Sequence, residues 1–324
     1  MTAPRAAAPL GRTLVGLTLL ALAAAGISLA FGSAREPTAE ILLEIRLPRV
    51  VIAALVGAGL ATAGALLQAL LRNPLADPYI LGISGGAALG GVAALALGWS
   101  LGAGAFTVPV FAFAGALGAT ALLYAIASAG GRAPGYSLLL TGVVFNAFAS
   151  SVIVFLTTAV DVGRLAGIFL WLIGSIRLVE PWLIAMVAAL LARGLGVGIH
   201  AAYALNLLTL GDETARHLGV EVARVRRRIL LATALMIGAS VAVSGLVGFV
   251  GLVVPHLLRL VIGSDHRLLV PASALLGAAF LMLADTLART LLQPTELPVG
   301  ALTALVGGPL FLWLLRRDLA RLGP

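Results

Sequence analysis

The sequence predicts an all-α integral membrane protein with about ten transmembrane helices. Of its 324 residues, 61% are hydrophobic and 10% are charged, and the mean hydropathy is +1.11. A soluble domain carries about 25% charged residues, and no soluble fold covers so much apolar surface with so few polar side chains. Because a spanning helix needs roughly 20 apolar residues, the length allows about ten, and open strands do not occur in hydrocarbon.

Ten apolar segments are long enough, or nearly so, to be spans. In chain order they are residues 10–31, 48–71, 80–98, 105–128, 137–158, 181–199, 229–247, 248–262, 268–289 and 298–315. The first could be mistaken for a signal peptide, but its apolar run is long and many spans follow, so we expect a retained helix. A shorter apolar piece, 165–174, is too short to cross and is expected to form a re-entrant or surface half-helix.

The region 229–262 decides the parity of this topology. As one helix it would be about 51 Å long, which is long for one span and short for two. Gly245, Gly248 and Gly251 lie in its middle and favour a break between two spans.

The distribution of arginine predicts the orientation. All 21 basic residues are Arg, and with ten spans and both termini inside, fifteen fall on the cytoplasmic side: Arg5, 12, 72, 132, 193, 216, 224, 226, 227, 228, 259, 267, 316, 317 and 321. Six fall outside: Arg35, 46, 49, 164, 177 and 289. This bias is the positive-inside pattern, and it explains the net charge of +8 without nucleic-acid binding.

One predicted cytoplasmic loop, 199–228, is long and polar. Its stretch Asp212–Val220 is compatible with a helix that begins with acidic residues, as the helix dipole favours. The loop is either a basic loop that only sets the topology or a docking surface for a cytosolic partner.

Arginines also occur on the predicted outer side, against the general bias. Arg46 and Arg49 flank Pro48, which suits the first turn of a helix. They either reach lipid headgroups or receive carboxylates from a partner, a role that suits the planar guanidinium. Asp285 and Arg289 are spaced i,i+4 and can pair on one helix face; Arg289 lies close enough to the outer surface to join the other two.

The segment Asn73–Pro78 links the second and third spans. Its two prolines prevent a continuous helix, so it is either an ordinary turn or a constriction on a pathway, where irregular backbone is tolerated. Glycines follow at the start of the third span and permit close helix packing: Gly82, Gly85, Gly86, Gly90 and Gly91.

Several kinds of chemistry find no support in the sequence. There is no cysteine, and the four histidines (200, 217, 256 and 266) lack ligand spacing. There is no P-loop, nucleophile elbow or zinc-protease motif, so we expect neither catalysis nor a cofactor bound by this chain. Asp285 is almost the only carboxylate within a span, which disfavours coupling to an ion gradient.

In combination, five motifs resemble the FecCD-type permeases of type II ATP-binding-cassette (ABC) importers, which take up ferric siderophores, haem and cobalamin. The resemblance covers roughly residues 40–316 and rests on RLPR at 46–49, GALLQALLRNPLADPYILGISGGAALG at 64–90, LNLLTLGDETARHLGV at 205–220, SGLVGFVGLVVPHLLRLVIGSDHR at 244–267 and ELPVGALTALVGGPLFLWLL at 296–315.

This resemblance implies a single permease domain over residues 1–324, with ten helices in an inverted-repeat bundle and a homodimer around the pathway. It implies a periplasmic binding protein that docks on Arg46, Arg49 and Arg289, and a cytoplasmic gate at Asn73 and Leu75. The piece 165–174 would line the outer mouth. Two cytosolic ATPases would dock at about 205–220, on Leu210, Gly211, Asp212, Glu213, Ala215, Arg216, Leu218 and Gly219.

The expected function is therefore import of an iron–siderophore, haem or cobalamin chelate across a bacterial inner membrane, with ATP and Mg²⁺ bound by the partner ATPases and both termini cytoplasmic. The motifs do not choose among the three chelates. An ion-coupled secondary transporter of a small organic solute is the alternative, and a membrane-embedded enzyme would need a catalytic cluster that the sequence lacks.

Overall fold

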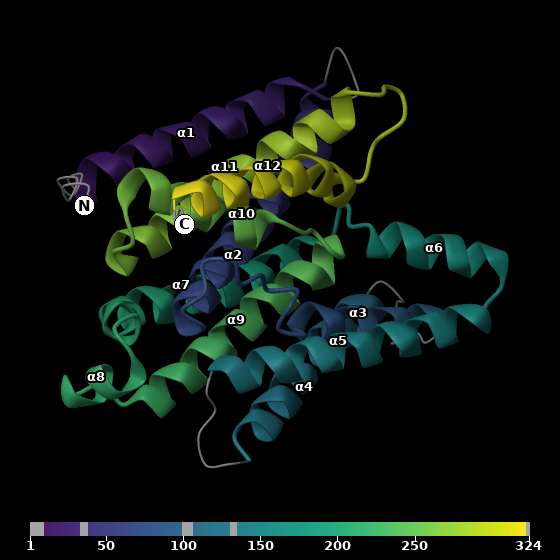
Figure 1. Cartoon of the computed structure of the whole chain (residues 1–324). Coiled ribbons are helices and arrows are strands. Elements are labelled where there is room, and N and C mark those ends of the chain that lie inside the picture. The colour runs from purple at the N-terminus through teal and green to yellow at the C-terminus, as the bar shows by residue number, and fades with distance from the viewer. Residues whose placement is uncertain (1–9, 33–37, 99–105, 130–134, 322–324) are drawn as a thin grey trace.

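The computed structural model describes residues 10–32, 38–98, 106–129 and 135–321. Arg5, Arg35 and Arg132 of the orientation count lie outside the described residues. Throughout the described part the regular structure is helical (Figure 1). The helices are α1 (Leu10–Ala30), the π-helical turn η1 (Ile41–Arg46), α2 (Leu47–Leu70), α3 (Ile83–Ala96), α4 (Thr107–Ala127), α5 (Gly135–Thr158), α6 (Val162–Leu172), α7 (Pro181–Leu208), α8 (Asp212–His217), α9 (Val222–Ser244), α10 (Val250–Ile262), α11 (His266–Thr290) and α12 (Val299–Arg321).

Seven helices of the described chain are long and apolar enough to cross a membrane, with η1 and α2 counted as one. Shorter apolar helices complete the predicted set of ten, namely α3, α10 and the apolar part of α12, Val299–Trp313. The all-helical membrane fold is thus confirmed, with helix limits that differ from the expected ones by a few residues at most ends.

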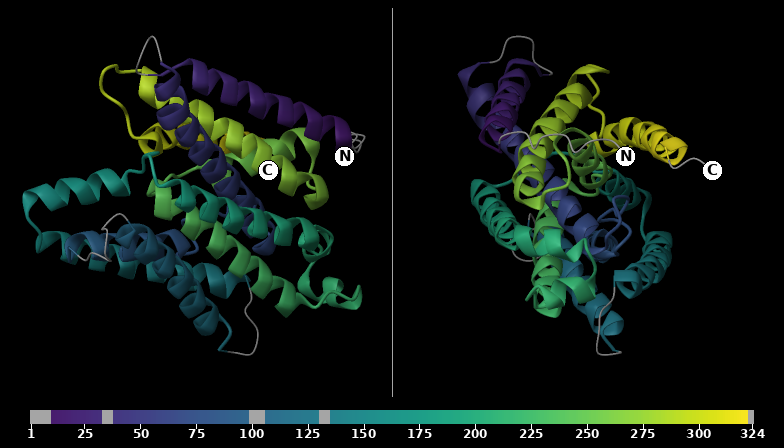
Figure 2. Two further views of the ribbon diagram at one scale, coloured as in Figure 1. Left: turned by 180° about the vertical axis from the view of Figure 1, so that it is seen from behind. Right: turned by 60° about the vertical axis from the view of Figure 1, so that its left-hand side comes forward.

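The long helices run side by side through the bundle and define two ends (Figures 1 and 2). One end carries α8 and is called the α8 end below. The other carries the start of α2 and is called the Arg49 end. Helix α6 extends away from the main body at the Arg49 end (Figure 2).

Helices α2 and α9 form the buried centre, with 78% of the most apolar window of each inside the fold. Glycines allow the neighbours of α2 to come close, because a Cβ at Gly57 would overlap the carbonyl oxygen of Gly277 on α11, and one at Gly64 would overlap that of Gly251 on α10. Small residues at such crossings are the usual means by which helices associate in lipid.

The predicted break within 229–262 is confirmed. Helix α9 ends at Ser244, Gly245 has a φ of 66°, and α10 begins at Val250. The short helices α3 and α10 both follow a residue with left-handed backbone, Gly82 (φ 82°) and Phe249 (φ 67°). Each of these short helices also follows one of the two central helices, and the two pairs run in opposite directions, which is the arrangement of an inverted repeat.

The region expected as a loop over 199–228 is mostly helical. Helix α7 continues to Leu208 and α9 begins at Val222, so a 13-residue connection, 209–221, contains α8. The expectation failed because the loop limit was placed where hydropathy drops, whereas a helix can continue beyond the hydrocarbon once its backbone is solvated. The expected half-helix 165–174 is α6, which begins at Val162 with the Asp161 side chain accepting from the Arg164 amide.

Candidate docking, coupling and gate sites

Arg46 fastens the end of α1 and is not a surface cation. Its side chain donates to the carbonyl oxygens of Leu29 (2.7 Å) and Ala30 (3.0 Å), and the residue is 3% exposed. Because the last carbonyls of a helix have no intrahelical donor, the guanidinium satisfies groups that would otherwise be unpaired. Pro48 lies in the first turn of α2, as predicted, but η1 precedes it.

Asp285 joins α2 to α11 at the Arg49 end. Its carboxylate lies 3.0 Å from Arg49 Nη2 and 3.0 Å from Arg289 Nε, so the predicted Asp285–Arg289 pair is confirmed. Its side chain is 2% exposed and that of Arg289 is 4% exposed. Charges at this depth are tolerated when they are paired, and one carboxylate here serves two guanidinium groups.

Arg49 is the most accessible of the three predicted docking arginines, with a side chain that is 15% exposed. Its Nη1 also pairs with Glu296 Oε2 at 2.8 Å, and the Glu296 side chain is 42% exposed. Glu296 was not singled out in the sequence, because the 298–315 span was taken to begin after it and nothing placed it opposite α2.

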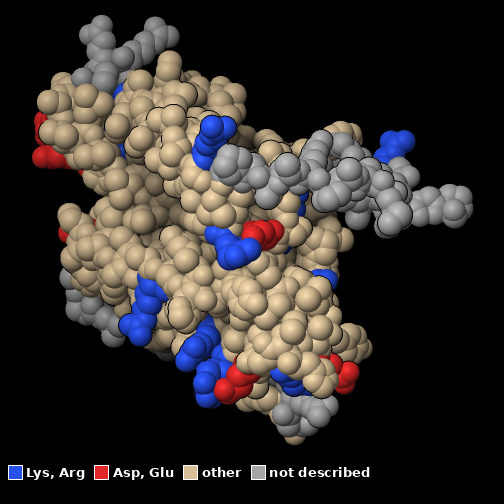
Figure 3. Space-filling model, turned by 90° about the vertical axis from the view of Figure 1, so that its left-hand side faces the viewer, with Lys and Arg blue, Asp and Glu red and all other residues tan. Residues whose placement is uncertain are grey.

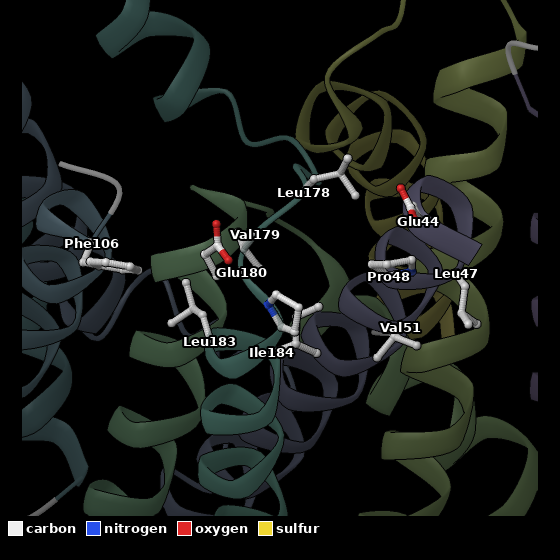
Figure 4. Close-up of a pocket in the computed structure, with 11 residues that line it drawn as sticks. Glu44, Leu47, Pro48, Val51, Phe106, Leu178, Val179, Glu180, Leu183 and Ile184 are labelled. Carbon is white, nitrogen blue, oxygen red and sulfur yellow. The ribbon is translucent and has the colours of Figure 1, made fainter. Parts of the chain in front are cut away.

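A cavity of about 580 Å³ lies beside this cluster, between the η1–α2 junction and the start of α7. Figure 4 shows Glu44 and Glu180 on different elements around it, with Val51, Leu183 and Ile184 among its apolar lining. The Arg49 end therefore combines a paired arginine cluster with a largely apolar hollow and two carboxylates at its rim.

At the α8 end, the predicted coupling residues form a compact projection. Gly211 (φ 115°) and Gly219 (φ 85°) bracket α8 in conformations that favour glycine. Ala215 is fully buried and faces the bundle, whereas Leu210 (62%) and Leu218 (56%) are exposed. Glu213 and Arg216 are exposed as well. Basic side chains gather on this end of the molecule, with acidic ones beside them (Figure 3).

Asp212 holds this projection to the bundle. It pairs with Arg72 at 3.1 Å and with Arg226 at 3.0 Å, and the Arg226 side chain is 5% exposed. From the sequence, both arginines could be placed only on the cytoplasmic side, because their convergence on Asp212 depends on how α2 and α9 meet at this end.

The predicted gate residues lie in the turn after α2. The Asn73 side chain accepts a hydrogen bond from the Leu75 amide at 2.9 Å, so it shapes the turn that carries Leu75. The backbone N–H of Asn73 donates to the Gln68 carbonyl oxygen, and the backbone N–H of Arg72 donates to the Ala69 carbonyl oxygen. Arg72 has a left-handed backbone (φ 52°) and occupies the position after the helix where glycine is usual. The turn thereby connects the gate to Asp212 through the Arg72 side chain.

Pro255 lies inside α10, and His256 next to it is 5% exposed. Among the described residues, no group of three or more His, Cys, Asp and Glu side chains is placed to hold a metal ion.

Comparison with known proteins agrees with the resemblance. The chain matches the FecCD transport family over residues 13–317. It is 44% identical over 319 residues to a hemin transport system permease protein of Yersinia pestis, with 95% of each chain covered. It is 46% identical over 283 residues to a cobalamin import system permease protein of Halobacterium salinarum, covering 86% of this chain and 74% of the relative.

A solved structure of an inward-facing, metal-chelate type ABC transporter superposes with a TM-score of 0.86 and 32% sequence identity. The alignment covers 95% of this chain and 99% of the solved one. From its sequence and its fold alike, this chain is a multi-pass membrane protein that belongs to the FecCD transport family.

Proposed function

We propose that this chain is the membrane permease subunit of an ABC importer that moves an intact metal chelate into the cytoplasm. The observation that carries the proposal is the end-to-end match, in sequence and in fold, to hemin and cobalamin permeases and to a metal-chelate transporter. An Fe(3+)-citrate import permease of Bacillus subtilis is 42% identical over 279 residues as well. The shared property of these substrates is a bulky chelated metal or organic ring system.

In this proposal the α8 end faces the cytoplasm of a bacterial inner membrane, and both termini are cytoplasmic. The arginine distribution supports the orientation, and the exposed leucines beside α8 offer an apolar contact for a partner. Two ATPase subunits, which carry ATP and Mg²⁺, would dock on the segment 210–219. This chain would bind no nucleotide and would do no chemistry.

A second copy of the chain is part of the proposal. Helix α5 presents a broad exposed apolar surface, which includes Leu140, Phe148, Val154 and Phe155, and only 17% of its most apolar window is buried inside the fold. Pairing across this surface would place Asn73 and Leu75 of each copy beside the common axis as a gate. Surrounding lipid would cover the remaining apolar faces.

The docking of a periplasmic binding protein is proposed for the Arg49 end. Arg46 and Arg289 would act from within, by holding α1 and Asp285 in place, and Arg49 would be the arginine that a partner carboxylate reaches. A carboxylate that approaches Arg49 would compete with Glu296, whose exposed side chain can move away. Such exchange of one carboxylate for another keeps the guanidinium paired throughout.

The test is reconstitution of the chain with its ATPase and binding protein in proteoliposomes. We expect ATP hydrolysis to rise when the loaded binding protein is added, and Arg49→Gln to weaken that stimulation at least tenfold while the ATPase stays bound. Arg177→Gln is the matched control, because Arg177 is an exposed arginine at the same end. Loss of stimulation in the control alone would move the docking site to Arg177, and no stimulation in the wild type would refute the importer.

The alternative of an ion-coupled secondary transporter requires titratable groups along a pathway. Asp285, the candidate carboxylate from the sequence, is committed to Arg49 and Arg289. This observation favours the ATP-driven reading, and uptake that proceeds without ATP would establish the alternative.

A further inference from the structure

A cavity at the α8 end is lined largely by polar residues, of which the gate and coupling arguments use only Asn73 and Arg72. It has a volume of about 310 Å³ and lies where the end of α2, the end of α7 and the α10–α11 connection meet. Its lining consists of Gln68, Ala69, Arg72, Asn73, Pro74, Thr209, Arg259, Ser264 and His266. Two of these residues are arginines and none is acidic, so the lining itself carries positive charge.

Arg259 supplies the least compensated of these charges. Its Nη1 donates to the side-chain oxygen of Gln68, and no ion pair joins it to an acidic residue of the described chain. Arg72, in contrast, is partly neutralised by Asp212. A guanidinium has five N–H donors, so Arg259 keeps donors for a further acceptor. A half-buried arginine without a carboxylate is costly, and an anion would remove that cost.

Asn206, which does not line the cavity, fixes the orientation of the His266 ring. Asn206 donates from its side-chain nitrogen to Asp265 at 2.7 Å, which directs its side-chain oxygen toward His266. That oxygen lies 2.7 Å from His266 Nδ1 and also accepts a hydrogen bond from the backbone N–H of His266. Because an amide oxygen only accepts, Nδ1 must carry a proton. Nε2 is then the acceptor of the neutral ring.

His266 Nε2 is the unsatisfied atom in this arrangement. The residue is 2% exposed, and Nε2 is buried without a hydrogen-bond partner among the described residues. A buried polar atom of this kind calls for a ligand or an ordered water. His266, with its unsatisfied Nε2, and Arg259, a cluster of donors, both line the cavity, together with Ser264, Thr209 and Asn73.

We propose that this cavity binds a phosphate group that carries a proton, as inorganic phosphate or a phosphate monoester. Its oxygens would accept from Arg259, and its O–H would donate to His266 Nε2. A simple carboxylate is disfavoured because it has no hydrogen-bond donor when ionised. Its oxygen lone pairs would then repel the lone pair of His266 Nε2. The proposal is independent of which substrate the permease carries.

The site has a mechanical link to the coupling segment. Arg72 lines the cavity and also pairs with Asp212 at the start of α8. A phosphate within reach of Arg72 would share the guanidinium with Asp212 and weaken the hold of the bundle on α8. Arg72 also has a left-handed backbone, which a non-glycine residue rarely adopts.

Binding can be measured on the full chain in phosphatidylcholine nanodiscs by equilibrium dialysis against radiolabelled inorganic phosphate. We expect one saturable site per chain with a Kd of about 1 mM or below, weakened at least tenfold by Arg259→Gln. Arg227→Gln is the control, because Arg227 is exposed on α9 at the same end and does not line the cavity. Absence of saturable binding in the wild type, or an equal loss in the control, would overturn the proposal.

A second measurement needs no variant and so does not depend on the folding of Arg259→Gln. In the wild type, the ¹⁵N resonance of His266 Nε2 should shift on addition of phosphate and not on addition of acetate at equal ionic strength. A shift with acetate alone would overturn the assignment to phosphate. Nanodiscs that contain phosphatidic acid distinguish the source: if that lipid shifts the resonance and blocks the radiolabel, the ligand is a lipid phosphate monoester, and if it does neither, the ligand is free phosphate.

Discussion

Arg72 Nη2 lies 3.1 Å from Asp212 Oδ1, and this ion pair joins the turn that contains Asn73 directly to the first residue of α8. One helix end thus carries the candidate gate and also holds the candidate coupling segment. The buried partner on the other side of Asp212 is Arg226, at 3.0 Å. Movement of α8 would therefore be transmitted through the Asp212 carboxylate to the turn that contains Asn73.

Asp212→Asn should uncouple the two elements. The change leaves Arg226 buried without its anion, and we expect a loss of about 1–3 kcal/mol in stability, since Asp212 itself is partly exposed. Substrate-stimulated ATP hydrolysis should fall more than basal hydrolysis, which an assay on the reconstituted complex measures. Glu221→Gln, which breaks the exposed pair with Arg224, is the control and should change neither.

Leu218→Ser should weaken the ATPase contact without harming the fold. Leu218 is 56% exposed, and substitutions at exposed positions usually change stability by about 0.5 kcal/mol or less. Co-purification of the ATPase with the variant permease measures the contact, and we expect at least a tenfold loss. Full retention of the ATPase would show that the surface beside α8 is not the docking site.

The ion pairs at the Arg49 end can be ranked by burial. Asp285→Asn leaves Arg49 and Arg289 short of their shared anion at a nearly dry position and should cost about 3–5 kcal/mol. Glu296→Gln removes only the exposed partner of Arg49 and should cost about 1 kcal/mol or less. Denaturant unfolding of the two purified variants gives both values. Equal losses would mean that the Asp285 cluster is open to solvent.

Gly64→Ala should disrupt the centre of the bundle. A Cβ there would overlap the Gly251 carbonyl oxygen, and the obstacle is backbone, which cannot rotate away. Overpacking of this kind costs about 1–3 kcal/mol or more. Gly26→Ala on α1 meets nothing within 4 Å and should fold normally. The yield of monodisperse protein in detergent compares the two, and an equal yield would contradict the close α2–α10 crossing.

The lowered pKa of Asp265 leads to a prediction of how the stability of the fold changes in acid. Asp265 is the N-cap residue just before α11 and lies outside the spanning segment, and hydrogen bonds from the Arg267 side chain lower its pKa to about 2 against the opposing effect of burial. Because the folded pKa lies below the unfolded value of about 3.9, the stabilisation is fully present above about pH 4 and is lost as the pH falls through about 2. The stability difference between wild type and Asp265→Asn should therefore close over that interval in acid titrations, and a constant difference would contradict the assignment.

The fold was largely predictable because hydropathy and helix geometry are local properties. The break after Ser244 followed from three glycines, and the Asp285–Arg289 pair from i,i+4 spacing. The extension of α7 to Leu208 was not predictable from hydropathy, since a helix need not end where the hydrocarbon ends.

The candidate site was only partly predictable, because its partners are far apart in the sequence. Arg46, Arg49 and Arg289 could be named from their place near the ends of spans. The burial of these arginines could not be predicted, because it depends on the α1 carbonyls and on Glu296, which are brought together by packing. The same holds for Arg72 and Arg226, which meet at Asp212 from two different helices.

The source of energy for transport tests the central claim most directly. Proteoliposomes that contain this permease, its ATPase and its binding protein would be given a labelled metal chelate, with ATP on the ATPase side or with an ion gradient alone. The account predicts uptake that requires hydrolysable ATP and persists when ionophores collapse every gradient. Uptake driven by the gradient without ATP would contradict it and identify a secondary transporter.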